Sequence, residues 1–386
     1  MRIVKARVRP SHPWVFSNEV VDPPVAALIG GEAVEVWDPR GRRVGVGYAN
    51  PRSLISIRLI SREVVDLDAV ELYRERLRAA VALRERLFPW RTAMRVCAGE
   101  ADGLPGLILD RYGDVLVAQV TTLGMEQRRP LLEAAIRDVL APTGVVSRDD
   151  VGLRAMEGLA GEARVWWGEV PDRVAFEENG VRFVADLLHG QKTGFFFDQA
   201  ENRAWMAARS RDTRVLDVYA HLGGWALHAL KGGARGAVTV DSSASANTLI
   251  AENGRLNDVS DRLEVRQGDA RDVMGELAQR GERFDIVCVD PPAFAKSRKN
   301  VGVALGAYKQ VNQAGARLVV PGGLLFASSC SHHILPERFE EAVVHGIRAA
   351  GREPVLVRRG GQAADHPILP GVPETEYLKH LVFVVR

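Results

Sequence analysis

The stretch Val215-Leu-Asp-Val-Tyr-Ala-His-Leu-Gly-Gly224 decides the fold of the second half of this 386-residue chain. Its first five residues predict a short buried strand, and the glycine pair precedes a helical pattern. From about residue 176, similar apolar runs alternate with helical stretches. The further predicted strands are 237–240, 263–266, 286–289, 324–327 and 381–385. Strands that alternate with helices indicate an α/β fold with a doubly wound parallel sheet.

Acidic residues mark the first three of these strands. Asp217 lies in the first, Asp241 ends the second, and Asp269 follows the third. Ligands of open α/β sheets bind outside the carboxyl ends of the strands. A carboxylate at the end of the second strand is placed to accept hydrogen bonds from a ribose diol, and the glycine pair lets the backbone approach a ligand closely. The alternative is that these three residues are helix N-caps.

The kind of cofactor follows from two motifs that the sequence lacks. Neither a G-x-G-x-x-G after the first strand nor a Walker A lysine motif is present, so a ligand without a pyrophosphate fits better. S-adenosylmethionine (SAM) is such a ligand. The predicted cofactor-binding residues along these strand ends are Asp217, Tyr219, Gly223, Asp241, Ser242, Asp269, Ala270 and Asp290.

The fourth strand leads into the stretch Phe284-Asp-Ile-Val-Cys-Val-Asp-Pro-Pro-Ala-Phe294. The two prolines stop the strand, which fixes the carboxylate of Asp290 where substrate meets cofactor. Asp-Pro-Pro-x-Phe is typical of methyltransferases that act on a flat nitrogenous ring: the acid binds a ring nitrogen or an amine, and the aromatic residue packs on the ring face. The alternative is a turn with an N-cap aspartate.

The loop beyond this motif, Lys296-Ser-Arg-Lys299, is basic. We expect it to hold RNA phosphates, although a merely solvated loop is the alternative. The predicted substrate-binding residues are therefore Pro291, Pro292, Phe294, Lys296, Arg298 and Lys299.

Cys330 lies at the carboxyl end of the fifth strand, on the same rim as Asp290. A thiolate that adds to carbon-6 of cytosine makes carbon-5 nucleophilic enough to attack a methylsulfonium, which is covalent catalysis. Cys330 and Asp290 are therefore the predicted catalytic residues, and a packed strand-end cysteine is the alternative. Cys288 lies within a buried strand and is expected in the core. His332 and His333 lack further ligand spacing, so no metal site is predicted.

The first part of the chain differs from the rest. Residues 1–65 carry ten Lys and Arg against six Asp and Glu, and short runs at 34–37, 44–48 and 54–59 predict a small β unit. This positive charge suits a nucleic-acid contact, or it is a solvated face. Asp68 and Glu71 predict a capping box at the start of a helix, which opens an α+β segment.

Three cysteines and no long apolar run predict a cytoplasmic protein without a membrane span.

At this point the sequence resembles the bacterial class I 23S rRNA (cytosine-5)-methyltransferases that carry an N-terminal PUA domain. The matching segments are His12-Pro-Trp-Val-Phe-Ser17, Asn50-Pro-Arg-Ser53, Glu100-Ala-Asp-Gly-Leu-Pro-Gly-Leu107, Gln191-Lys-Thr-Gly-Phe-Phe-Phe-Asp-Gln199, Asp290-Pro-Pro-Ala-Phe294, Ser328-Ser-Cys-Ser-His-His333, Asp365-His-Pro367 and Glu376-Tyr-Leu-Lys379. The resemblance implies a PUA domain at 1–66, a central α+β linking domain at 67–175 and a Rossmann-like methyltransferase domain at 176–386. It also implies that the cofactor and substrate region includes Gln191, Thr193, Gly194 and Asp198, with Cys330 at the nucleophile position. One departure is Ala220-His221-Leu222, where the family usually has a small or hydroxyl residue before the glycine pair.

The predicted function is SAM-dependent methylation of carbon-5 of a cytidine in 23S rRNA, or in a large-subunit assembly intermediate. Two alternatives remain open at this stage. One is methylation of an exocyclic nitrogen of a base, which needs no thiol. The other is a non-catalytic RNA-binding ribosome-assembly factor. Whether the chain forms a homodimer is also left open.

Overall fold

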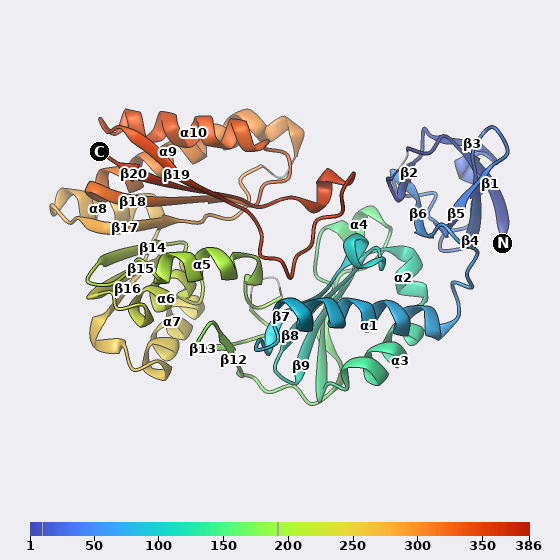
Figure 1. The fold of residues 1–386 in the computed structure, drawn as a ribbon, viewed down its shortest axis with the longest axis horizontal. Helices are drawn as coiled ribbons and strands as arrows, with labels where there is room; N and C mark the ends of the chain where they lie inside the picture. Colours follow the sequence, from blue (N-terminus) through green and yellow to red (C-terminus); the bar gives the residue numbers. More distant parts are fainter. Residues whose placement is uncertain (10, 191–192, 296) are drawn as a thin grey trace. The chain divides into compact units, whose positions relative to one another are not determined.

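The computed structural model describes residues 1–9, 11–190, 193–295 and 297–386 (Figure 1). Its contacts divide the chain into two compact units. Unit 1 consists of Met1–Phe176, Asp186–Phe197 and Ala364–Thr375. Unit 2 consists of Glu177–Ala185, Asp198–Ala363 and Glu376–Arg386. The predicted domain boundaries at 66 and 175 remain predictions.

The first sheet of unit 1 has six strands in the order β2-β6-β5-β4-β1-β3. They are β1 (Arg2–Ala6), β2 (Trp14–Phe16), β3 (Val20–Asp22), β4 (Ala33–Trp37), β5 (Arg43–Ala49) and β6 (Ile55–Ser61). In β4, Val34 and Val36 are fully buried while the residues between them are half-buried, the period of two that a one-sided sheet requires. The three strands predicted between residues 34 and 59 are confirmed.

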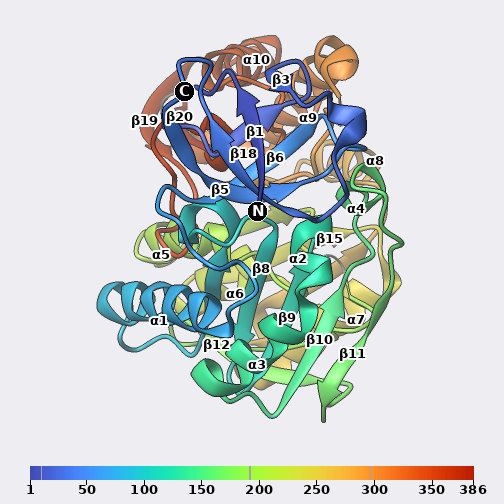
Figure 2. The ribbon, with the colours of Figure 1, turned by 90° about the vertical axis from the view of Figure 1, so that its right-hand side faces the viewer.

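The second sheet of unit 1 has five strands in the order β11-β10-β9-β8-β7. They are β7 (Ala93–Ala98), β8 (Leu107–Tyr112), β9 (Val115–Val120), β10 (Gly144–Arg148) and β11 (Ala163–Gly168). The helices of this region are α1 (Val70–Leu87), α2 (Leu123–Gln127), α3 (Arg129–Leu140) and α4 (Leu153–Met156). Helix α1 packs against α3 and β7 (Figure 1). Figure 2 shows α1 and α3 from a second side.

The capping box expected at the start of α1 is wrong, although the helix forms. Ala69 is the N-cap and makes no side-chain hydrogen bond to the helix. The Asp68 carboxylate instead lies 3.1 Å from Nε of Arg128, and Glu71 pairs with Arg74 and Arg78 along the helix. Guanidinium groups thus compete successfully for both carboxylates.

Unit 2 is built on a seven-stranded sheet in the order β16-β15-β14-β17-β18-β20-β19. Its strands are β14 (Arg214–Val218), β15 (Gly236–Asp241), β16 (Leu263–Gln267), β17 (Phe284–Val289), β18 (Val319–Ser329), β19 (Pro354–Gly360) and β20 (Lys379–Val385). Its helices are α5 (Ala200–Ala207), α6 (Gly224–Lys231), α7 (Ala244–Leu256), α8 (Ala270–Gln279), α9 (Val301–Leu318) and α10 (Pro336–Ala349). Strands β12 (Val174–Glu178) and β13 (Val181–Ala185) form a separate two-stranded sheet.

The α/β fold is confirmed, but the sheet is mixed rather than parallel throughout. Strands β14 to β18 pair in parallel, whereas β20 runs antiparallel to both β18 and β19. Strand β20 enters the sheet without a crossover helix, so it returns between β18 and the edge strand β19 in the opposite direction. The sequence analysis found β20 but missed β19, and periodicity alone gave β20 no direction.

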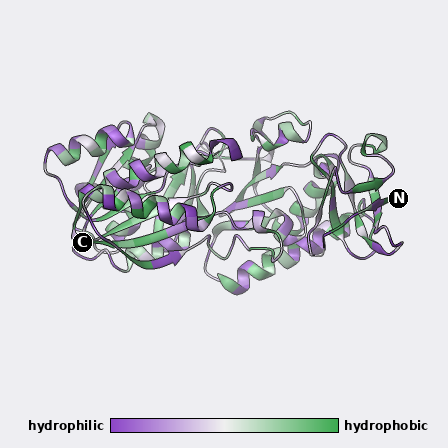
Figure 3. Cartoon of the chain, turned by 90° about the horizontal axis from the view of Figure 1, so that it is seen from above, coloured by the Kyte–Doolittle hydropathy of each residue, from purple (hydrophilic) through white to green (hydrophobic). Residues whose placement is uncertain are grey.

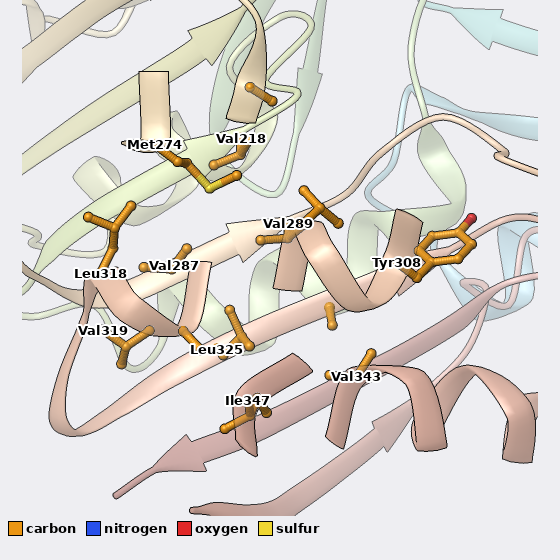
Figure 4. Close-up of a cluster of buried hydrophobic side chains, with 14 of the residues drawn as sticks. Val218, Met274, Val287, Val289, Tyr308, Leu318, Val319, Leu325, Val343 and Ile347 are labelled. Atoms are coloured by element: carbon orange, nitrogen blue, oxygen red, sulfur yellow. The ribbon is translucent and has the colours of Figure 1, made fainter. Parts of the chain in front are cut away.

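One core cluster of unit 2 lies between this sheet and helices α8, α9 and α10. Val287 and Leu325 from adjacent strands are fully buried against Val343 and Ile347 of α10 (Figure 4). Colouring by hydropathy shows apolar residues along the strands and mixed faces on the helices (Figure 3). None of the described helices has the length and apolar content needed to cross a bilayer.

Candidate active site

The first strand of the large sheet presents a buried carboxylate. Asp217 is fully buried in β14, and its Oδ2 accepts a hydrogen bond of 3.0 Å from the backbone N–H of Ala226 in α6. Its other oxygen has no hydrogen-bond partner among the described residues. Burial raises the pKa of Asp217 to about 7, and the nearby charges of Asp290 and Asp241 act in the same direction.

The turn after β14 has an unusual backbone. Tyr219, His221 and Gly223 have positive φ angles of 67°, 53° and 77°. For the two non-glycine residues this conformation is costly, and such strain tends to collect at functional sites. The turn is tied to the next strand, because the N–H groups of Tyr219 and Ala220 both donate to the carbonyl of Val240, at 2.9 and 3.1 Å. At Gly223 a Cβ would lie 3.3 Å from Cγ2 of Ile250, so glycine also leaves room there.

Asp241 ties this turn to the end of β15. Its Oδ2 accepts the N–H of His221 and its Oδ1 accepts the N–H of Ser243, both at 2.9 Å. The residue is half-buried, and a carboxylate accepts about four hydrogen bonds, so Asp241 keeps acceptor capacity for a ligand; its contact with a ribose diol remains a prediction. The N-cap of α7 is Ser243, so the N-cap alternative does not describe Asp241. Ser242, between the two, is exposed.

Asp269 is the member of the acidic set that does act as an N-cap. Its carboxylate accepts the N–H of Arg271 at 2.9 Å at the start of α8, which begins with the buried Ala270. It is exposed, and a surface hollow of about 600 Å³ beside it is lined also by Gln267 and Val273. A cap and a ligand contact are compatible for a carboxylate. The role of Asp269 toward a cofactor remains a prediction.

A buried amide joins the ends of the two central strands. Gln199 Nε2 lies 3.1 Å from both Oδ2 of Asp290, after β17, and Oγ of Ser328, in β18. Trp225 Nε1 donates to the same Asp290 oxygen at 3.2 Å. The amide is oriented in turn by Asn202, whose Nδ2 donates to Gln199 Oε1 at 2.8 Å. The Asp290 carboxylate is therefore held in a fixed position at the rim of the sheet.

The rest of the Asp-Pro-Pro-Ala-Phe motif is tied to the loop after β18. Pro291 is buried, Pro292 is exposed, and the ring of Phe294 packs 4.7 Å from that of Tyr308. The Tyr308 hydroxyl in turn lies 2.9 Å from Oγ of Ser331. The structure thus brings the aromatic residue of the motif and the Cys330 loop together.

Cys330 directly follows β18 and is partly exposed, whereas Cys97 and Cys288 are fully buried. Burial raises the pKa of both buried thiols well above the ordinary value, which suppresses their thiolate forms. Cys288 packs in the core as expected. Of the three thiols, Cys330 has the exposure that a nucleophile needs.

The remaining predicted site residues are less closely grouped. Asp198 is buried in unit 2 and its Oδ2 accepts the Tyr377 hydroxyl at 2.8 Å. Thr193 and Gly194 are buried in unit 1, where the Thr193 carbonyl accepts the Tyr112 hydroxyl at 3.0 Å. Gln191 and Lys296 lie outside the described residues. Within the described ranges, no group of three or more His, Cys, Asp or Glu side chains is arranged to hold a metal ion.

The basic residues proposed to contact RNA differ in their surroundings. Arg298 and Lys299 are exposed in the 3₁₀ turn Arg298–Asn300. Within residues 1–65, by contrast, several arginines are engaged by carboxylates. Those with a carboxylate within 4.0 Å include Arg2, Arg9, Arg42, Arg43 and Arg58. The net charge of residues 1–65 therefore overstates the cationic surface available to a ligand.

Gln199, Trp225 and Ser328 were missed as site residues by the sequence analysis. Gln199 and Ser328 both lay inside segments that matched the resembled family, which was the available signal. Trp225 follows the glycine pair in a helical pattern, where an aromatic side chain usually means core packing.

Three features of unit 2 together define a methyltransferase that uses SAM. They are the order of its strands, the buried carboxylate of Asp217, and the carboxylates of Asp241 and Asp290 at the strand ends. The family model described as S-adenosylmethionine-dependent methyltransferase matches residues 150–383, and the model of a PUA-like domain matches residues 3–62. The expected PUA domain and the SAM dependence are thereby confirmed.

Comparison with named relatives identifies the methyltransferase family to which the chain belongs. A protein named Ribosomal RNA large subunit methyltransferase I from Aeromonas salmonicida is 36% identical over 383 residues, which cover 97% of this chain and 96% of the relative. Its namesake from Tolumonas auensis is 37% identical over 376 residues, or 96% and 94% of the two chains. The chain belongs to the family of these large-subunit rRNA methyltransferase I proteins.

Solved structures support the fold. A putative SAM-dependent methyltransferase from Streptococcus mutans superposes with a TM-score of 0.83 at 19% identity over 100% of both chains. A putative methyltransferase complexed with SAH gives a TM-score of 0.85 at 20% identity over 99% of both chains. At this level of identity the likeness concerns the fold.

The residues present fit SAM. A bound nucleoside with a cationic group would use three features: the unpartnered buried oxygen of Asp217, the strained turn with Gly223, and the Asp241 carboxylate at the end of β15. When bound, SAM supplies a methyl group carried on a sulfonium. Asp217, Gly223 and Asp241 are the residues that would hold it.

Proposed function

We propose that this protein methylates carbon-5 of a cytidine in large-subunit ribosomal RNA and that Cys330 forms a covalent adduct with the base. The observation that supports the proposal is the partly exposed thiol of Cys330 at the same sheet rim as the fixed Asp290 carboxylate. The names of the relatives support the RNA substrate.

The chemistry follows from these two side chains. The Cys330 thiolate adds to carbon-6, forming an S–C bond and shifting the π electrons of the 5,6 double bond onto carbon-5. Carbon-5 would take the methyl group from the sulfonium of bound SAM, whose C–S bond breaks and whose sulfur leaves as a neutral thioether. The proton on carbon-5 then leaves to water. The returning electron pair re-forms the double bond and expels the thiolate, so the enzyme is restored.

Asp290 would hold the base during these steps. Two neutral donors fix one of its oxygens, and an ionised carboxylate accepts about four hydrogen bonds, so the exocyclic amine of cytosine is a suitable further donor. The ring of Phe294 would pack against the base face. To reach this rim, the target base has to leave its stack.

RNA would be held by more than the base pocket. The PUA-like domain and the exposed pair Arg298 and Lys299 are the proposed phosphate contacts. The RNA substrate is either free rRNA or rRNA within a large-subunit assembly intermediate. The comparisons give no support to a homodimer, so the proposal concerns the single chain.

Methylation of an exocyclic nitrogen is the second candidate, because Asp-Pro-Pro-Ala-Phe294 also suits that reaction. It needs no thiol, and Cys330 therefore discriminates between the two. A non-catalytic assembly factor is not favoured, because the chain belongs to a methyltransferase family and retains Asp217, Asp241 and Asp290 at the strand ends.

The test is replacement of Cys330 by alanine, with Cys288→Ala as the matched control. Cys330→Ala is expected to abolish methylation of rRNA while SAM binding, measured by calorimetry, stays within about twofold, because the thiol acts on the base. RNA with 5-fluorocytidine at the target is expected to trap a covalent complex with wild type and with Cys288→Ala. Methylation by Cys330→Ala, or a product methylated on the exocyclic nitrogen, refutes the proposal in favour of the second candidate.

A further inference from the structure

The first residue of β20 lies beside the proposed nucleophile, and the antiparallel direction of β20 is the reason. Lys379 pairs with Ser329 in the register of β18 and β20. Because the strands run in opposite directions, the beginning of β20 meets the end of β18, where Cys330 follows. A parallel strand at this position would bring its carboxyl end to the rim instead.

The side chain of Lys379 is held toward the Cys330 loop. Lys379 is 8% exposed, and its Nζ donates to the carbonyl of Ser331 at 2.6 Å and to the carbonyl of Tyr377 at 2.8 Å. Both of these acceptors are neutral. In the described part of the chain no carboxylate lies within 4.0 Å of this ammonium, although buried charges are normally paired.

Within the described ranges, the charged and titratable groups around this pair include Glu376, before β20, and Tyr308 of α9. Cys330 and Glu376 interact electrostatically with Lys379, and both raise its pKa, while burial lowers it to about 8. Tyr308 of α9 also faces Cys330, and burial raises the pKa of that phenol, so it stays neutral near pH 7. The amine of Lys379 is therefore a cation beside the thiol on the neighbouring strand, and with a pKa of about 8 it is mostly protonated at neutral pH.

We propose that Lys379 is a positioning residue whose buried ammonium stabilises the thiolate form of Cys330. The inference rests on the proposed function, in which Cys330 must be a thiolate to add to the base. The thiolate is the nucleophilic form, and an adjacent cation increases its population near neutral pH. The two carbonyl hydrogen bonds hold the ammonium in place, so the thiol gains a fixed counter-charge.

Alkylation of the thiol tests this without RNA. Cys330 is the partly exposed thiol, so its reaction with iodoacetamide is followed by mass spectrometry as a function of pH in a Cys97→Ala/Cys288→Ala background. In Lys379→Gln, which keeps an N–H donor without the charge, the pH of half-maximal rate is expected to rise by roughly one unit or more. Lys379→Arg, which keeps the charge, is expected to have a midpoint close to that of wild type. Lys309→Gln, on the exposed face of α9, is the matched control and should leave the midpoint unchanged.

The outcomes separate this inference from the function on which it rests. An unchanged midpoint in Lys379→Gln overturns the role of Lys379, even where Cys330→Ala is inactive. A raised midpoint with active Cys330→Ala would leave the charge effect standing and refute covalent catalysis. Lys379→Met is the second variant, and SAM binding by calorimetry reports whether each variant folds. If the pH profile of methylation shifts upward with the alkylation profile, the effect acts through the thiolate and not through the two carbonyl contacts.

Discussion

Replacing Asp217 by asparagine is expected to stabilise the cofactor-free protein at pH 8. Asp217 is fully buried, and its folded-state pKa of about 7 compares with an ordinary value of 3.8. A difference of one pH unit corresponds to about 1.4 kcal/mol, so ionising this residue in the folded state costs roughly 4 kcal/mol. Asparagine keeps the shape and carries no charge, so the variant avoids this cost.

The pH dependence has a definite sign. The folded state holds the proton between pH 3.8 and about 7 while the unfolded chain has lost it, so wild-type stability falls as the pH rises through this window. Above pH 7 the loss is complete. The advantage of Asp217→Asn is therefore absent near pH 4 and reaches its full size near pH 8.

Hydrogen exchange measured by mass spectrometry is the suitable assay, because the chain has two compact units and a single unfolding midpoint would mix them. Peptides from β14 and α6 are compared between wild type and Asp217→Asn at each pH, without cofactor. At pH 8 the variant is expected to exchange up to about a thousandfold more slowly in these peptides. Asp258→Asn, at a side chain that is 88% exposed, is the control. Equal protection of wild type and Asp217→Asn at pH 8, or a gain of the same size at pH 5 and pH 8, would refute the reasoning.

Three further predictions concern the rim of the sheet. Asp241→Ala is expected to weaken SAM binding by about 1.5–3 kcal/mol, because hydrogen bonds to a charged acceptor are lost; calorimetry that shows unchanged affinity rejects the assignment. Gln199→Leu removes the amide between the two central strands and is expected to slow methylation roughly ten- to a hundredfold, with SAM affinity kept; a normal rate in single-turnover assays would show that Asp290 does not need this support. Neutralising Arg298 and Lys299 is expected to lower the salt slope of single-stranded RNA binding by about 1.4; an unaltered slope would mean that neither residue contacts a phosphate.

The sequence sufficed for those parts of the site that depend on strand ends. In a parallel sheet the carboxyl ends of neighbouring strands share one edge, so the positions of Asp241, Asp290 and Cys330 after their strands already placed them on a common rim. The presence of these strands followed from the alternation of apolar runs with helices, whereas their order in the sheet came from the structure. The burial of Cys288 followed in the same way from its apolar neighbours.

The parts of the site and the sheet that the sequence did not predict depend on contacts between residues distant in the sequence. Gln199 bridges Asp290 and Ser328, which lie 91 and 129 positions away, and no local pattern encodes such a bridge. The direction of β20 was equally inaccessible, because the unbroken apolar run 381–385 is compatible with a strand of either direction. Lys379 lies in a segment that matches the resembled family, but its position in the sequence predicts no role for it.

The alternation of side chains along β20 has a consequence for how mutations in this segment are tolerated. Lys379 serves the Cys330 loop, whereas His380 bonds Ser328 Oγ at 2.9 Å and stacks on Trp225. Deleting or inserting one residue at the start of β20 would exchange the two faces of the strand. An imidazole would then stand where the proposed counter-charge of Cys330 lies, and a lysine would enter the site beside Trp225 that His380 occupies. We therefore expect a one-residue insertion or deletion at the start of β20 to reduce activity more than a point substitution there.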